Sequence, residues 1–180
     1  MLTKFNENDI NGIIDLRYFS INNVCNQKLY DKPYNFLHQE ALEKLIKASK
    51  IAKKLGYKLK IWDAYRPLKT QQFMFDFFAD NKNLQNFFSN PQTGSIPHCR
   101  GVAVDLTLCD PHNNEIDMGS DFDELSDLAN HNSDKISLEQ LKNRNILLSI
   151  MTLAGFDFYR MEWWHYQLFE ARKYPVIEQS

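Results

Sequence analysis

One segment, a helix that runs directly into a strand, constrains the fold more than any other feature of the sequence. From Phe36 to Leu55, leucines and alanines recur at the spacing of one helical face, and Gly56 follows where helices typically end. The next residues, Tyr57 to Trp62, alternate between apolar and lysine side chains, as a half-buried strand does. Because both elements must bury one apolar face, the pattern predicts a helix packed on a sheet.

A second helix is predicted from Pro67 to about Ala79. Proline suits the first helical turn, where its missing N–H group does no harm. We expect this helix to carry Phe73, Phe77 and Phe78 inward, so that their rings join the core.

The remainder of the chain adds more strands than helices. A loop is expected over residues 80–97 and an alternating strand over 102–108. Ser137 and Gln140 match a capping box, which predicts the start of a third helix. Two short strands, or one bent strand, are expected over residues 156–169.

This order of elements lacks the regular strand–helix alternation of a parallel sheet, and residues 1–34 add one or two short strands. We therefore expect an α+β fold with a small, mainly antiparallel sheet packed by helices. The sequence contains no internal repeat and no linker of low complexity. A single domain is expected over residues 1–180, since a chain of this size buries roughly 70% of its surface on folding.

Composition argues against several kinds of partner. The formal net charge is -2, whereas nucleic-acid-binding domains usually carry a basic excess. Lysines gather between Lys44 and Lys60, but they alternate with apolar residues and indicate solvent-facing sides of a helix and a strand. No apolar run approaches the roughly 20 residues that span a bilayer. We expect neither nucleic acid nor a membrane as partner, and the sequence leaves the oligomeric state open.

Cysteine usage and the first residues bear on location. Cys25, Cys99 and Cys109 form no CxxC pair and give no sign of a disulfide framework. Residues 1–15 lack a basic start followed by an apolar run, so they do not resemble a secretory signal. The expected location is the cytoplasm.

Asp105 is unusual because it lies in the middle of an apolar strand. A carboxylate buried there needs a partner, which is a hydrogen-bond cluster, an arginine or a metal ion. His98 precedes it, and Gly101 allows a turn that folds His98 back beside the strand face of Asp105. The two side chains together indicate a candidate metal site.

A second pair, Glu162 and His165, lies among bulky aromatic residues. In a uniform strand, side chains three positions apart point to opposite faces. Both serve one site only if the chain bends at Trp163–Trp164, so a turn or bulge is predicted there. In the alternative interpretation the aromatic rings fill the core, Glu162 reaches solvent and His165 is an ordinary core residue.

Two imidazoles and two carboxylates match the needs of a zinc hydrolase. Catalytic zinc typically takes three protein ligands and lowers the pKa of a water molecule to about 7. A second carboxylate then accepts the proton and passes it to the leaving amine. Asp105 is short and set in a strand, which suits a ligand, whereas the longer Glu162 reaches the water. We therefore assign zinc to His98, Asp105 and His165, and the general base and acid role to Glu162.

Arg66 offers the cation that an oxyanion needs during attack. It follows a strand and precedes a helix, a position from which rigid elements aim a side chain into a site. A planar guanidinium that is always charged suits this role. The alternative is a surface pair with Asp63, which would contribute at most about 1 kcal/mol. In a third interpretation, Asp63 orients Arg66.

Three motifs occur in a fixed order: DAYRP at 63–67, HCRGVAVDLTL at 98–108 and EWWHY at 162–166. At these separations they closely resemble the D-alanyl-D-alanine dipeptidases, a family related to vancomycin-resistance enzymes and to zinc D,D-carboxypeptidases. Residues 16–18 and 118–123 resemble the family's N-terminal segment and its substrate-binding loop, so the likeness extends over nearly the full chain.

The resemblance implies zinc on the same three ligands, base duty for Glu162 and transition-state support from Arg66. It adds Tyr18 and Asp123 as residues that hold the ammonium group of the substrate. Without the resemblance, Tyr18 is an ordinary core residue, and Asp123 is an exposed loop carboxylate or a helix cap.

One departure from the family concerns the carboxylate end of the substrate. The family usually has a serine two residues before its first zinc histidine, where this chain has Ile96. The Ile96 side chain cannot donate a hydrogen bond. Either Ser95 or a backbone N–H group replaces the serine, or the preferred dipeptide differs, which makes Ser95 a further candidate for substrate binding.

The sequence thus predicts a zinc dipeptidase, with one Zn²⁺ per chain, that hydrolyses D-Ala-D-Ala or a similar small D-dipeptide to free amino acids. A first alternative is a D,D- or L,D-carboxypeptidase acting on longer peptidoglycan stem peptides, which the lack of a recognised export signal disfavours. A second is a catalytically silent zinc-binding module, which the presence of Glu162 disfavours.

Overall fold

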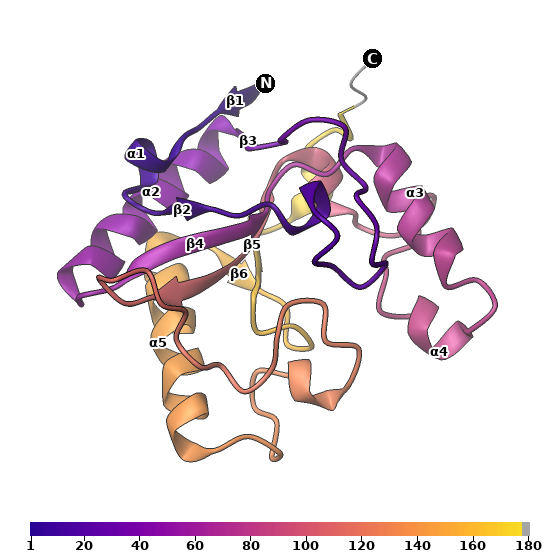
Figure 1. The fold of residues 1–180 in the computed structure, drawn as a ribbon. Coiled ribbons are helices and arrows are strands. Elements are labelled where there is room, and N and C mark those ends of the chain that lie inside the picture. Colours follow the sequence, from indigo (N-terminus) through magenta and orange to yellow (C-terminus); the bar gives the residue numbers. More distant parts are fainter. Residues whose placement is uncertain (178–180) are drawn as a thin grey trace.

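A five-stranded sheet runs through the computed structural model, which describes residues 1–177 (Figure 1). Its strand order is β2-β4-β5-β7-β6, and a separate two-stranded sheet pairs β1 with β3. The strands are β1 (Leu2–Lys4), β2 (Ile13–Ile14), β3 (Phe36–His38), β4 (Lys58–Asp63), β5 (Ala103–Cys109), β6 (Asp157–Phe158) and β7 (His165–Gln167). The α-helices are α1 (Glu7–Ile10), α2 (Gln39–Lys54), α3 (Leu68–Phe77), α4 (Lys82–Gln85) and α5 (Leu138–Ala154). The 3-10 helices are η1 (Arg17–Phe19), η2 (Pro97–Arg100), η3 (Asp127–Ala129) and η4 (Ala171–Lys173).

Most of the described strand pairs are antiparallel. The pairs β4–β5, β5–β7 and β7–β6 run antiparallel, whereas the short strand β2 runs parallel to β4. Helices α2 and α5 pack against each other, and α2 also packs on β4. The predicted α+β fold, with a small and mainly antiparallel sheet packed by helices, is confirmed.

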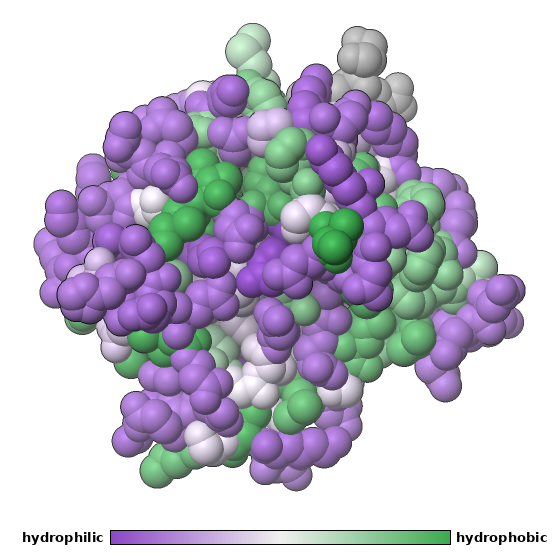
Figure 2. Space-filling view, in the orientation of Figure 1, coloured by the Kyte–Doolittle hydropathy of each residue, from purple (hydrophilic) through white to green (hydrophobic). Residues whose placement is uncertain are grey.

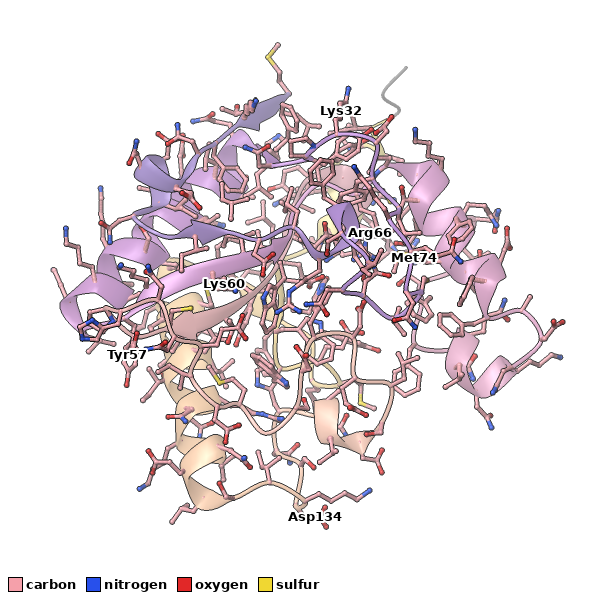
Figure 3. All side chains as sticks on the ribbon, in the orientation of Figure 1. Lys32, Tyr57, Lys60, Arg66, Met74 and Asp134 are labelled. Atoms are coloured by element: carbon pink, nitrogen blue, oxygen red, sulfur yellow. The ribbon has the colours of Figure 1, made fainter. Side chains whose placement is uncertain are left out.

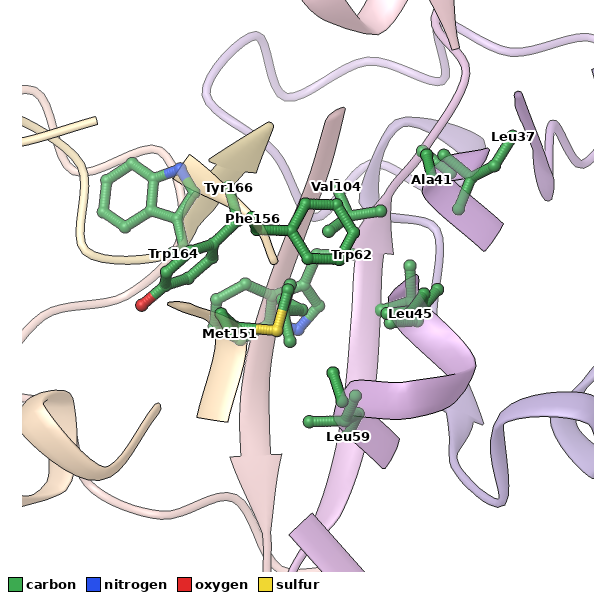
Figure 4. Close-up of a cluster of buried hydrophobic side chains, with 14 of the residues drawn as sticks. Leu37, Ala41, Leu45, Leu59, Trp62, Val104, Met151, Phe156, Trp164 and Tyr166 are labelled. Carbon is green, nitrogen blue, oxygen red and sulfur yellow. The ribbon is translucent and has the colours of Figure 1, made fainter. Parts of the chain in front are cut away.

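The apolar stripe predicted for the first helix forms one wall of the core. Ala41 and Leu45 of α2 are fully buried, and they lie in one cluster with Leu59 of β4, Val104 of β5 and Met151 of α5 (Figure 4). Burying a leucine side chain completely stabilises a fold by about 1.5–3 kcal/mol. This cluster therefore fixes α2 and α5 on the sheet whose strands carry the polar residues described below.

The helix α2 begins three residues later than predicted, because the preceding residues form β3. Phe36–His38 pairs with Leu2–Lys4. The Glu40 N–H group donates a hydrogen bond to His38 Nδ1 (3.3 Å), so His38 caps the helix. The strand partner lies far away in the sequence, and a local pattern gives no sign of it.

The prediction that α3 turns its phenylalanines inward is wrong for two of them. Phe73 and Phe77 are 41% and 44% exposed, and apolar side chains gather on the surface over α3 and α4 (Figure 2). The helix instead buries Gln71 and Met74. Gln71 accepts a hydrogen bond from Arg66 (2.9 Å) and donates one to the Ser89 carbonyl oxygen (2.8 Å), so the face of the helix that carries Gln71 turns inward.

Helix α5 starts as predicted. The Ser137 side chain accepts a hydrogen bond from the Gln140 N–H group (3.2 Å), and the Gln140 side chain accepts one from the Ser137 N–H group (2.8 Å). The helix ends at Gly155, which has φ +108. Across the part of the chain that the structure describes, α5 and the other helices are too short or too polar to cross a membrane.

Candidate active site

Three polar side chains lie in one row across the centre of the sheet. On β5, Asp105 stands directly opposite His165 of β7. On its other side Asp105 stands opposite Asp63 of β4, because the register shifts between Ile61 and Asp63. Such a bulge inserts an extra residue, here Trp62, and re-aims the side chains beyond it. The shift therefore brings two carboxylates and an imidazole together.

His98 reaches this row from the 3-10 helix η2. Gly101 ends η2 with φ +67, a left-handed conformation that glycine adopts without strain. A Cβ atom at Gly101 would lie against the Leu2 side chain and 3.2 Å from the backbone nitrogen of His38. The turn folds His98 back beside Asp105, as the sequence predicts.

Three potential ligand atoms converge at one point in the described structure. His98 Nε2, Asp105 Oδ1 and His165 Nδ1 lie 3.0–3.2 Å from one another. Two imidazole nitrogens and a carboxylate oxygen form a donor set that suits zinc. The other ring nitrogen of His98 donates to the carbonyl oxygen of Ala64 (2.7 Å). His165 Nε2–H donates to Gln167 Oε1 (3.1 Å), so each inward-facing nitrogen is the one that a metal would bind once it has lost its own proton.

The electrostatics of this cluster favour an ionised Asp105. Burial alone would raise the pKa of its carboxyl group, but the charges and hydrogen bonds of His98 and His165 lower that pKa below its ordinary value. For His165, burial lowers the pKa, but the hydrogen bond to Asp105 and the nearby carboxylates raise it above its ordinary value. Asp105 is therefore a carboxylate at neutral pH, the form that a metal ligand requires.

Glu162 approaches the cluster from the loop before β7. The His165 N–H group donates to the Glu162 carbonyl oxygen (3.2 Å), which closes a turn over Trp163–Trp164 and confirms the predicted bend. Glu162 Oε2 lies 4.0 Å from His165 Nδ1, and the Glu162 side chain is 19% exposed. Burial raises the pKa of Glu162 to about 7. A carboxyl group with such a pKa is suited to accept a proton and to return it.

Arg66 is buried beside the cluster, near the centre of the molecule (Figure 3). Its Nε and Nη2 atoms lie 2.9 and 2.8 Å from Asp63 Oδ2. Its Nη1 donates to Gln71 Oε1 (2.9 Å), and its Nη2 donates to Asp105 Oδ2 (3.4 Å). Asp63 is fully buried, so the interpretation of a surface ion pair is wrong. Asp63 instead holds the guanidinium in one orientation.

Tyr18 and Asp123 form another part of the same site. The Tyr18 hydroxyl donates to Asp123 Oδ1 (2.9 Å), and the Val24 N–H group donates to Asp123 Oδ2 (3.3 Å). Burial raises the pKa of Asp123 to about 7. The interpretation of Asp123 as an exposed loop carboxylate is therefore wrong, and Tyr18 has a polar contact beyond its role in the core.

A cavity of about 310 Å³ joins these side chains. Eight residues that the sequence singles out all line it: Tyr18, Arg66, Ser95, His98, Asp105, Asp123, Glu162 and His165. Ile96 also lines it, and its φ of +40 is a strained conformation for a β-branched residue. The Ser95 carbonyl oxygen next to it accepts a hydrogen bond from Arg100 Nε (2.7 Å), which holds this wall in place.

Sequence reasoning missed two glutamines that contact the site. Gln71 binds Arg66, and Gln167 binds His165. The position of Gln167 could have been predicted, because a residue two positions after His165 in a strand faces the same side of the sheet. Gln71 had none, since the orientation of α3 follows from tertiary contacts.

The chain matches the model of a known protein family. The model of the D-Ala-D-Ala dipeptidase family, a peptidase family, matches residues 8–179. This match covers all eight cavity residues that the sequence singles out and both glutamines.

Several curated relatives carry the same name. The chain is 35% identical over 164 residues to the D-alanyl-D-alanine dipeptidase of Escherichia coli K12, which covers 91% of this chain and 82% of the relative. It is 36% identical to the D-alanyl-D-alanine dipeptidase of Enterococcus faecium, over 72% of this chain and 71% of the relative. The corresponding protein of Enterococcus faecalis V583 is 33% identical, over 67% and 66% of the two chains. On these matches, the chain belongs to the D-Ala-D-Ala dipeptidase family of metallopeptidases.

Proposed function

We propose that the protein hydrolyses D-Ala-D-Ala, or a similarly small D-dipeptide, with one zinc ion held by His98, Asp105 and His165. The observation that carries this proposal is the convergence of three ligand atoms, 3.0–3.2 Å apart, in a cavity that also contains Glu162. The names of the relatives support the choice of substrate. Zinc, when bound, supplies a hydroxide nucleophile at neutral pH because it lowers the pKa of water.

Glu162 moves the proton in this proposal. Its carboxylate accepts a proton from the attacking water and then donates the same proton to the nitrogen of the leaving D-alanine. The raised pKa, about 7, supports both halves of this transfer, because the group neither holds nor releases the proton too strongly. No net proton is left on Glu162 at the end of the cycle.

Arg66 stabilises the negative charge that develops on the carbonyl oxygen of the scissile bond. Asp63 and Gln71 fix the guanidinium before substrate arrives, so little reorganisation is needed during the reaction. Loss of a donor of this kind reduces kcat by about 10²–10³-fold in other hydrolases.

The two ends of the dipeptide carry opposite charges and need different partners. Asp123, oriented by Tyr18, supplies the negative charge for the free ammonium group. Ser95, which lines the cavity, is our candidate donor for the free carboxylate. A cavity of about 310 Å³ that contains an anion for a free amino terminus favours a short substrate over an internal segment of a polymer.

The decisive experiment uses the purified protein, ZnCl₂ and D-Ala-D-Ala, with release of D-alanine as the measurement. We expect Glu162→Gln to reduce kcat by at least about 10²-fold, the usual contribution of a general base, while zinc binding is retained. Glu139→Gln, an exposed carboxylate on α5, is the matched control and should leave the rate unchanged. Equal release of D-alanine by wild type and Glu162→Gln would falsify the proposal.

Substrate length separates the proposal from its main alternative. N-acetyl-D-Ala-D-Ala lacks the ammonium group, and we expect it to be a poor substrate because Asp123 then faces a neutral amide. Faster hydrolysis of the acetylated compound or of a stem pentapeptide would favour a carboxypeptidase. Zinc binding without turnover of any of these compounds would favour a silent binding module.

We also propose that residues 1–180 form one domain that works in a reducing compartment, the cytoplasm. Cys25, Cys99 and Cys109 support this, because all three are buried free thiols. Activity recovered in the cytoplasmic fraction, and not outside the cell, is the expected result of fractionation.

A further inference from the structure

Gln167 contacts the candidate ligand His165 on the side away from the other two ligands. It is the last residue of β7 and shares a strand face with His165, two positions earlier. Gln167 Oε1 lies 3.1 Å from His165 Nε2. The side chain also lines the cavity that contains the ligand cluster. Nothing in the hydrolysis described above uses this residue.

The contact between Gln167 Oε1 and His165 Nε2 matches the tautomer in which Nε2 carries the proton. His165 Nδ1 faces Asp105 Oδ1 at 3.0 Å and His98 Nε2 at 3.2 Å, so Nδ1 is the atom that would bind a metal. It has a free lone pair only when the proton resides on Nε2. The Gln167 carbonyl oxygen accepts that proton's hydrogen bond. With a metal on Nδ1, Nε2 carries the proton, and the reverse amide orientation would then oppose two N–H donors.

The two histidines of the cluster are held in different ways. His98 donates its Nδ1–H to a backbone carbonyl, that of Ala64, which no substitution removes. His165 donates to the side chain of Gln167, which a substitution does remove. Partners of metal-bound histidines commonly change metal affinity or activity by about 10–100-fold when they are lost.

We propose that Gln167 is a positioning residue that holds His165 in the Nε2–H tautomer and thereby sets the affinity of the site for zinc. This inference rests on the proposed metal site. The positioning role differs from a purely structural one, in which Gln167 only fills space at the end of β7. In that case any side chain of similar size would serve.

The test measures the dissociation constant of Zn²⁺ itself, by competition with a chromophoric chelator, at fixed pH. Gln167→Met and Gln167→Leu keep the volume but remove the acceptor, and each should weaken zinc binding by about 10–100-fold. Gln167→Glu keeps an acceptor and should bind zinc at least as tightly as wild type. Gln72→Met, at a glutamine of α3 that bonds to Asp76, is the control and should match wild type.

A second measurement reports the hydrogen bond to Gln167 directly. In the zinc-bound protein, ¹H–¹⁵N NMR should show a slowly exchanging Nε2–H proton of His165 in wild type and in Gln167→Glu. Faster exchange of this proton with water is expected in Gln167→Met. A role in packing alone would leave this signal unchanged.

The outcomes separate the two proposals. If wild type does not bind Zn²⁺, the metal site is wrong and the role of Gln167 falls with it. If wild type binds Zn²⁺ but Gln167→Met and Gln167→Leu bind it equally well, the metal site stands and the positioning role is overturned. If circular dichroism shows that both apolar variants misfold, Gln167→Glu decides, because weakened zinc binding in this variant would also overturn the role.

Discussion

Asp123, the proposed partner of the substrate ammonium group, is a half-buried carboxyl group whose raised pKa predicts a pH dependence of substrate binding. Its raised pKa, about 7, means that the group is protonated below pH 7 and cannot then pair with an ammonium ion. The α-amino group of the substrate in turn loses its proton near pH 8. We expect KM for D-Ala-D-Ala to be lowest between these values and to rise as the pH falls through 7.

The matching variant is Asp123→Asn, measured at saturating zinc from pH 5.5 to 8.5. Its KM should be higher at every pH and should lack the rise below pH 7. If KM of Asp123→Asn still rises below pH 7 as it does in wild type, the group that titrates there is not Asp123.

His131 is expected to make the stability of the fold depend on pH. The ring is buried against Phe158 and Tyr166, and neither ring nitrogen has a hydrogen-bond partner in the described structure. Burial, with a smaller effect of the Arg144 charge, lowers the pKa of His131 to about 4. A base with a lowered pKa contributes full stability above its unfolded value of about 6.5 and loses it as the pH falls towards 4.

Unfolding by urea at pH 7.5 and pH 4.5 measures this effect. The lowered pKa corresponds to a contribution of at most about 3 kcal/mol to the free energy of unfolding at neutral pH. Most of this contribution is lost by pH 4.5. His131→Phe removes the titrating group, so its free energy of unfolding should fall less than that of wild type between the two pH values. An identical fall in both proteins would show that His131 is already protonated, or already hydrated, in the native state.

At the scale of elements, the turn between η2 and β5 decides where His98 lies. Gly101 has φ +67, and a Cβ atom there would meet Leu2 and His38. Gly56 has φ +84 but has no atom near the corresponding position. Both Gly→Ala changes impose the left-handed penalty of about 1–2 kcal/mol, but only Gly101→Ala adds an overpacking cost of about 1–3 kcal/mol.

We therefore expect Gly101→Ala to lower the free energy of unfolding more than Gly56→Ala does. It should also weaken zinc binding, because η2 shifts with its histidine, whereas Gly56→Ala should leave zinc binding intact. Equal effects of the two changes on both quantities would mean that the crowding at Gly101 is relieved without moving η2.

Local sequence patterns predict some elements of this fold and leave others hidden. The α2 stripe, the β5 alternation and the Ser137 capping box depend on neighbours within a few residues, and these elements are close to their predicted positions. The strand β3 and the inward face of α3 depend on partners farther along the chain, namely Leu2–Lys4 for β3 and the Ser89 carbonyl oxygen, which accepts a hydrogen bond from Gln71, for α3. No periodicity encodes such partners. The bulge that sets Asp63 opposite Asp105 is hidden for the same reason.

At the scale of the whole molecule, metal binding and folding are linked. The proposed ligands come from η2, β5 and β7, and the unfolded chain does not hold them together. A metal that binds only the folded state stabilises it by about 2.7 kcal/mol when its concentration is 100 times the dissociation constant. For a chain of this length, that corresponds to a rise in Tm of roughly 5–10 °C.

Differential scanning calorimetry with zinc and with EDTA checks this prediction. Wild type should melt higher with zinc, and Asp105→Asn should show a much smaller difference, because it replaces a charged ligand by a neutral one. The Tm of wild type must return to its EDTA value when the zinc is chelated. A zinc-independent Tm in wild type would contradict a single tight site in the folded state.

Five of the eight cavity residues were predicted from the residues themselves, because each carries a reactive group in an unusual setting, such as Asp105 in an apolar strand. The other three, Tyr18, Ser95 and Asp123, were predicted only through the resemblance to the family. Their shared cavity was not predicted, since residues 18 and 165 meet only through the arrangement of the sheet. The shape of that cavity also depends on Ile96, and no sequence pattern predicts its left-handed backbone conformation.

The order of the three proposed ligands along the chain has a consequence for biosynthesis. His98 and Asp105 leave the ribosome long before His165, which lies on β7 and is added to the sheet beside β5. A nascent chain that ends after α5 already contains two of the three ligands but has no third one to complete the set. Peptidase activity should therefore appear abruptly, late in synthesis, when the last strands dock, and partially translated chains should be inert towards D-Ala-D-Ala.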